Sequence, residues 1–208
     1  LLQSYEKMVS LPIMNRIILM LVALAMLGSC TLKGERKTRA KSPTIDLLLK
    51  TTPVKDQGKS SLCWVFAMLA TIETEHLMRG DSVNLSTAYV SRMALRQRMQ
   101  ATYLERGTHP LHLRGMASNA LTAIADYGVL AHDTYQVENS SIFGVLTKKV
   151  HNVGKLAIAQ HEGLDRLNEH FESLADQSLG ALPKAQFMLG AEYTFGEFGR
   201  SVCRRDEY

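Results

Sequence analysis

The chain has 208 residues, of which 46% are hydrophobic, so it is long enough for one domain with a sizeable core. Its formal net charge is only +4. Because no basic stripe is interleaved with aromatic residues, the composition argues against a nucleic-acid-binding protein. The sequence starts with Leu1 rather than Met, and we expect residues 1–13 to be an extension upstream of the true start.

An export signal is predicted for residues 14–29. One arginine precedes an apolar run, 17–27, that is too short to span a bilayer core of about 30 Å but suits a signal peptide. The small residues before Cys30 resemble a bacterial lipobox. The resemblance implies cleavage after Ser29 and lipidation of Cys30, which would anchor the protein to a membrane of the bacterial cell envelope. The alternative is an ordinary signal peptide with an incidental cysteine.

Residues 30–50 are expected to form a flexible tether, since 31–43 is polar, basic and almost free of large apolar residues. Attraction of its positive charges to an anionic lipid surface is the alternative to a solvated linker. The remaining residues, 51–208, are expected to form the folded domain.

The stretch from Thr52 to Ala67 contains an extended run, a polar turn and a Cys-Trp pair that opens an apolar, helix-like segment. At the first turn of that helix, Cys63 would face unpaired N–H groups and the positive end of the helix dipole, which favour the nucleophilic thiolate. Gln57 lies six positions earlier, across a turn. Its amide would converge with the Cys63 N–H on one point, as an oxyanion hole requires.

A Gln followed six positions later by Cys-Trp resembles the papain-like cysteine peptidases. The resemblance implies that Cys63 is the nucleophile, that Gln57 is an oxyanion donor and that Trp64 lines the substrate cleft. Ser60 departs from the family, which has a disulfide-forming cysteine there, and the bulky Leu62 is closer to the bleomycin-hydrolase branch. The alternative is a buried cysteine at a helix start, with Trp64 in the core.

The resemblance further implies an α+β fold of the papain-like kind, of which this chain carries mainly the α-helical half. It implies peptides as substrates, and no cofactor or metal ion.

Two helices are predicted in the first part of the domain. The helix from Cys63 is expected to end near Arg79, with Gly80 as the stop residue. The next helix is expected over residues 87–99, with Ser86 as its N-cap. Its buried side is predicted to carry Tyr89, Val90 and Met93 but not Leu95.

A third helix is predicted from residues 114–116 to Tyr127, with Gly128 after its end. Its buried face is expected to carry Met116, Ala120, Ile124 and Tyr127. Gly115 resembles the glycine-rich turn that lines the substrate cleft in the papain-like family. An ordinary glycine before a helix is the alternative.

Residues 145–179 are predicted to be mostly helical and to end at Gly180. Their buried stripe consists of Leu164, Leu167, Phe171 and Leu174. The stretch 179–198 resembles bacterial relatives of bleomycin hydrolase, in which it leads into the second half of the domain.

A papain-type mechanism also needs a histidine and an asparagine that orients it. None of the seven histidines lies in the family's strand context, and Trp64 is the only tryptophan, so the Asn-Ser-Trp segment is absent. We therefore expect the catalytic His and Asn to lie beyond Tyr208 and the chain as given to be inactive. His109 and His112 are spaced like a metal pair, but no cysteine or carboxylate cluster completes a site. Cys203 has no predicted role, and no structural disulfide is expected.

Three functions fit these residues. The first is a lipid-anchored, aminopeptidase-like cysteine peptidase that acts through a thioester. The second is a catalytically inactive lipoprotein with the same fold, serving as a binding scaffold. The third is a different thiol enzyme, such as an acyltransferase. Peptide substrates and a membrane are the expected partners, and the oligomeric state does not follow from the sequence.

Overall fold

A computed structural model of the chain describes residues 13, 15, 17, 18, 20–22 and 45–204. The chain divides into two units between Asp46 and Leu47. In the first unit, the described residues up to 22 are helical. Cys30 and the lipobox-like residues before it lie outside the described residues. No helix in the described part of the chain combines the length and the apolar character needed to cross a membrane.

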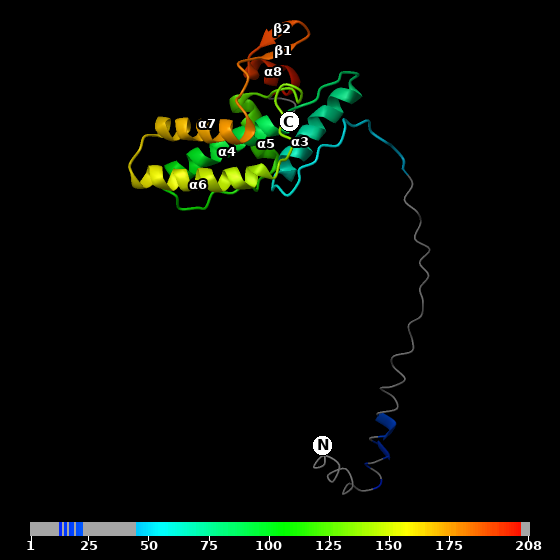
Figure 1. Cartoon of the computed structure of the whole chain (residues 1–208). Helices are drawn as coiled ribbons and strands as arrows, with labels where there is room; N and C mark the ends of the chain where they lie inside the picture. The colour runs from blue at the N-terminus through cyan, green and yellow to red at the C-terminus, as the bar shows by residue number, and fades with distance from the viewer. Residues whose placement is uncertain (1–12, 14, 16, 19, 23–44, 205–208) are drawn as a thin grey trace. The chain divides into compact units, whose positions relative to one another are not determined.

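The second unit is built mainly from α-helices and contains one short antiparallel hairpin (Figure 1). Its first three helices are α3 (Cys63–Met78), α4 (Thr87–Leu104) and α5 (Ala117–Tyr127). They are followed by α6 (Ile142–Ala159), α7 (Leu164–Leu179), β1 (Gln186–Met188), β2 (Ala191–Tyr193) and α8 (Phe195–Val202). The expected α+β composition with a predominance of helix is therefore confirmed at this coarse level.

The central helix of this unit is α4, which packs against α3, α5, α6 and α7. Every residue from Thr87 to Leu95 is buried, which confirms the predicted burial of Tyr89, Val90 and Met93. The expectation that Leu95 lies off the buried side is wrong, because a helix with neighbours on most sides has no exposed face there. The helix also continues to Leu104 rather than ending at 99.

The helix boundaries follow from local chemistry in most places. The Ser86 hydroxyl accepts a hydrogen bond from the Tyr89 N–H at 3.0 Å, so Ser86 is the N-cap of α4 as predicted. Helix α3 ends at Met78, and Gly80 follows with a φ of +85°. The start of the third helix differs from the prediction. Met116 is its extended N-cap and is 70% exposed, because it lies outside the helical register.

The predicted helical region 145–179 consists of two helices, α6 and α7, which lie beside α4 (Figure 1). Leu167 and Phe171 are fully buried on α7, as expected, whereas Leu164 and Leu174 are half-buried. Arg92 of α4 is also fully buried, and its guanidinium forms ion pairs with two carboxylates of α7, those of Glu172 at 2.5 Å and Asp176 at 2.7 Å. Sequence patterns did not predict this buried ion pair.

The hairpin and α8 were not predicted. The β1–β2 turn contains Leu189 and Gly190, both with positive φ, as the tight turns of two-residue hairpins require. Helix α8 then packs on the end of α5. A side chain on Gly128 would place its Cβ only 2.0 Å from the Phe195 carbonyl oxygen, so glycine permits this close approach.

Candidate active site

Cys63 is the first residue of α3, as predicted, and its side chain is exposed. The N-cap position before it is occupied by Leu62, which has no side-chain acceptor and is fully buried. The Cys63 N–H donates no hydrogen bond to any residue in the described part of the chain. An exposed thiol therefore lies at a helix end whose first backbone donors are open.

The chain reaches Cys63 through a tight turn from Gln57 to Ser60. The Gln57 carbonyl accepts hydrogen bonds from the Ser60 N–H at 3.3 Å and from the Ser60 hydroxyl at 2.7 Å. Gly58 has a φ of +55° within this turn. The half-buried Gln57 amide donates to the Ser60 carbonyl at 3.5 Å, so the side chain adds a further hydrogen bond within the same turn. Its predicted convergence with the Cys63 N–H stays a prediction.

Ser141, at the start of α6, holds this turn from the other side. Its hydroxyl accepts from the Lys59 N–H at 3.0 Å, and a Cβ on Gly58 would lie 2.7 Å from the same oxygen. The Ser141 hydroxyl makes no cap hydrogen bond for α6 itself. Sequence reasoning missed this contact, because a serine before a helix indicates only a possible cap.

The extended run before the turn is fixed by Glu73 of α3, whose side chain is 1% exposed. The Glu73 carboxylate pairs with the Lys55 ammonium at 2.5 Å and accepts from the Leu85 N–H at 2.6 Å and from the Thr52 hydroxyl. A buried carboxylate needs such partners to offset its desolvation. Glu73 is ten residues beyond Cys63, which corresponds to about 15 Å along the helix. This pair fixes the approach to the site without touching the thiol.

Trp64 lies inside the fold, directly after Cys63. Its indole N–H donates to the Leu113 carbonyl at 2.8 Å. A Cβ on Gly115 would lie 2.6 Å from the indole ring, so only glycine allows the backbone to pack so closely on Trp64. The structure therefore brings together the two residues that the sequence assigned to the substrate cleft. Trp64 is buried and Gly115 is half-buried beside it.

In the described part of the chain, Cys63 forms no hydrogen bond with a histidine. His76 lies about 20 Å along α3 from Cys63, and its Nε2 donates to the Val202 carbonyl at 2.8 Å. Its Nδ1 lies 2.8 Å from Asp81, and this hydrogen bond holds the pKa of the Asp81 carboxyl below its usual value.

Two further histidines have defined surroundings. Burial, and then the nearby Lys55 ammonium, lower the pKa of His132 against the opposing effect of the Asp133 and Glu73 carboxylates. The His112 Nδ1 accepts from the Arg98 guanidinium at 3.1 Å. Among the residues that the structure describes, no group of three His, Cys, Asp or Glu side chains could hold a metal ion. No disulfide joins Cys63 to Cys203.

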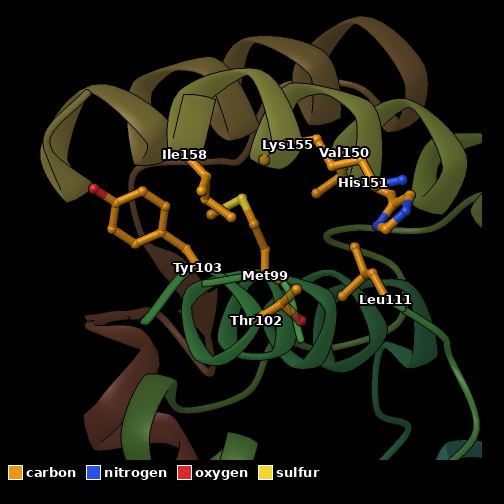
Figure 2. A pocket seen from close by; sticks show the side chains of 10 residues that line it. Met99, Thr102, Tyr103, Leu111, Val150, His151, Lys155 and Ile158 are labelled. Atoms are coloured by element: carbon orange, nitrogen blue, oxygen red, sulfur yellow. The ribbon is translucent and has the colours of Figure 1, made fainter. Parts of the chain in front are cut away.

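A cavity lies away from these residues, between α4 and α6 (Figure 2). Side chains of both helices face it, among them Met99, Tyr103, Val150 and Ile158. Its volume is about 10 Å³, enough for about one water molecule and too small for a substrate. An open depression of about 470 Å³ shares Tyr103 and Ile158 with it, and neither contains Cys63 or Gln57 in its lining.

No protein-family model and no curated protein sequence matches this chain.

Proposed function

We propose that this chain carries the helical part of a papain-like cysteine peptidase of the bleomycin-hydrolase and aminopeptidase branch. The observation that carries this proposal is an exposed thiol, Cys63, on a helix start that has no side-chain cap. The adjoining turn with Gln57 and the contact between Trp64 and Gly115 support it. These residues supply a nucleophile, donors for a developing negative charge and a surface beside both.

In the proposed reaction, the Cys63 thiolate attacks the peptide carbonyl carbon and a C–S bond forms, while the π electron pair moves onto oxygen. The Cys63 N–H and the Gln57 amide donate hydrogen bonds to that oxyanion. The electron pair then returns, the C–N bond breaks, and the leaving amine takes a proton from a histidine imidazolium. Water hydrolyses the resulting thioester and regenerates the thiol. The family resemblance implies this histidine and an asparagine that orients it.

Labelling of the full chain with a peptidyl epoxide tests the nucleophile. We expect Cys63 to be alkylated at least about tenfold faster than Cys203, because Cys63 is exposed and the proposed cleft would hold the peptidyl epoxide beside it. Cys203→Ser should keep the fast labelling and Cys63→Ser should abolish it, while both variants keep their helical circular dichroism. Equal rates at the two cysteines would contradict the proposal and favour the inactive scaffold.

The anchoring proposal is separate. We propose that Cys30 is lipidated and that residues 30–50 tether the domain to the bacterial cell envelope. The precursor expressed in a bacterium should enter the membrane fraction with added lipid mass, because two or more acyl chains give stable anchoring. Cys30→Ala should leave an uncleaved or soluble product. A soluble wild type without lipid mass would contradict this proposal and leave the peptidase proposal unaffected.

A further inference from the structure

Two arginines of α4 have opposite surroundings. Arg92 is fully buried and forms ion pairs with Glu172 and Asp176. Arg98 is half-buried, and within residues 45–204 its polar partners are both on His112. Its Nη1 donates to the His112 carbonyl at 2.9 Å and to the His112 Nδ1 at 3.1 Å. In the described part of the chain, Arg98 therefore has no carboxylate partner.

The position of Arg98 is set by the residue next to Cys63. Its guanidinium carbon lies 5.5 Å from the centre of the Trp64 ring, a cation–π arrangement that fixes the long side chain. A Cβ on Gly115 would lie 2.8 Å from Arg98 Nη2. The guanidinium thus packs against the surface formed by Trp64 and Gly115, and Nη2 and the indole take up the space that a side chain at Gly115 would need.

Two donors of Arg98 stay unused on this surface. The contacts with His112 take up Nη1, whereas Nε and Nη2 have no hydrogen-bond partner among the described residues. The Nε atoms of Arg92 and Arg96 are buried without a partner, whereas Nε and Nη2 of Arg98 reach solvent. Together, Nε and Nη2 form one edge of the planar fork with which arginine binds both oxygens of a carboxylate.

We propose that Arg98 binds a carboxylate group of a peptide ligand through this free edge, on the surface that Trp64 and Gly115 form. The inference rests on the proposed function, because it takes the ligand to be the peptide that Cys63 attacks, and Trp64, on which Arg98 stacks, directly follows Cys63 in the chain. It names the substrate class more closely as peptides that carry a carboxylate, either at the C-terminus or on an acidic side chain. Burial lowers the pKa of Arg98, yet an arginine stays protonated throughout the physiological range.

Trp64 is the only tryptophan of the chain and lies against the Arg98 guanidinium, so its fluorescence serves as the probe of binding at this site. Four blocked tripeptides form the titration series for the full chain carrying Cys63→Ser, which excludes covalent chemistry. Acetyl-trialanine with a free carboxylate is compared with its amide. Acetyl-Ala-Glu-Ala amide is compared with its Gln twin. We expect at least one carboxylate peptide to bind about tenfold more tightly than its neutral twin, and the pair that differs identifies the source of the carboxylate.

Substitutions of Arg98 assign the effect. Arg98→Met keeps an apolar stem over Trp64 and should abolish the carboxylate preference. Arg114→Met, at an exposed arginine in the loop directly before Gly115, is the matched control and should keep the preference. If Arg98→Met does not fold, Arg98→Lys decides, since a lysine lacks the planar fork and should reduce the preference. An unchanged preference in whichever Arg98 variant folds would overturn the proposal.

Equal affinity of the Cys63→Ser chain with Arg98 intact for carboxylate and amide peptides would also overturn it, and Arg98 would then serve only to pack on Trp64. This outcome differs from a failure of the proposed function. An unreactive Cys63 in the epoxide experiment, together with a carboxylate-dependent Trp64 signal, would remove the peptidase and retain the binding site. A reactive Cys63 without that signal would retain the peptidase proposal and remove the carboxylate site.

Discussion

The starts of α3 and α8 are held in different ways. At α8, the Thr194 hydroxyl accepts from the Glu197 N–H at 3.2 Å, and the Glu197 carboxylate accepts from the Thr194 N–H at 2.9 Å. This capping box satisfies the helix end locally. At α3, Leu62 replaces the capping residue, and the start is held by core packing and by contacts with distant residues. Support by long-range contacts leaves the backbone donors beside Cys63 open, whereas a local cap would occupy them.

The largest expected effect concerns Glu73, which fixes the run leading to α3. Glu73→Gln leaves the Lys55 ammonium without its buried counter-charge, and we expect the free energy of unfolding to fall by about 3–5 kcal/mol. Glu75→Gln is the matched control on the same helix, because Glu75 is partly exposed and pairs with Arg79 at 3.5 Å. It should cost less than about 1 kcal/mol. Similar losses for both in urea unfolding would refute the long-range support of α3.

The next effect tests why a leucine occupies the N-cap of α3. Leu62→Ser supplies a capping hydroxyl worth about 1 kcal/mol but removes a fully buried side chain, which costs about 2–5 kcal/mol. We therefore expect a net loss of about 1–4 kcal/mol in urea unfolding. Thr194→Ala, which removes the α8 cap from an exposed position, should cost about 1 kcal/mol. Net stabilisation by Leu62→Ser would mean that packing does not determine this position.

The smallest effect is a pH dependence that only the α8 start should show. The Thr194 N–H, and then its hydroxyl, hold the pKa of the Glu197 carboxyl below its ordinary value of 4.5. A carboxyl with a lowered folded-state pKa stabilises the fold above its ordinary value, and that contribution is lost as the pH falls through the folded-state pKa. The amide NMR signals of Thr194 and Glu197 should therefore shift below about pH 4.5.

Glu197→Gln should remove this response. The amides of Cys63 and Trp64 should show no corresponding shift, because no carboxylate caps α3. A shared acid transition at both helix starts would mean that the two are not held independently.

The features that sequence could predict are those that neighbouring residues determine. The start of α3 at Cys63 and the Ser86 cap of α4 follow from residue type and spacing. The burial of Leu95 and the contact of Ser141 with the Gln57 turn depend on elements distant in the chain, which no local pattern specifies. The hairpin was missed because its turn contains Leu189, a residue type that rarely adopts a positive φ.

The same division applies to the candidate site. The pairing of Cys63 with Trp64 and the importance of Gly115 were visible as motifs in the sequence. The direction of the Arg98 side chain could not be predicted from the sequence, because an arginine on an amphipathic helix indicates only a solvated face. Its stacking on Trp64 depends on where the loop around Leu113 crosses α3.

The most direct test of the central claim measures the affinity of the full chain for a peptide aldehyde. Its adduct with Cys63 places an oxygen where the oxyanion would form, whereas epoxide alkylation needs no such donor site. We expect Gln57→Ala to weaken aldehyde binding by about 100-fold or more while the rate of epoxide labelling of Cys63 stays nearly unchanged. Gln160→Ala, an exposed glutamine at the end of α6, is the control and should change neither. Unchanged aldehyde affinity in Gln57→Ala would contradict the account of an open, donor-lined helix start beside a nucleophilic thiol.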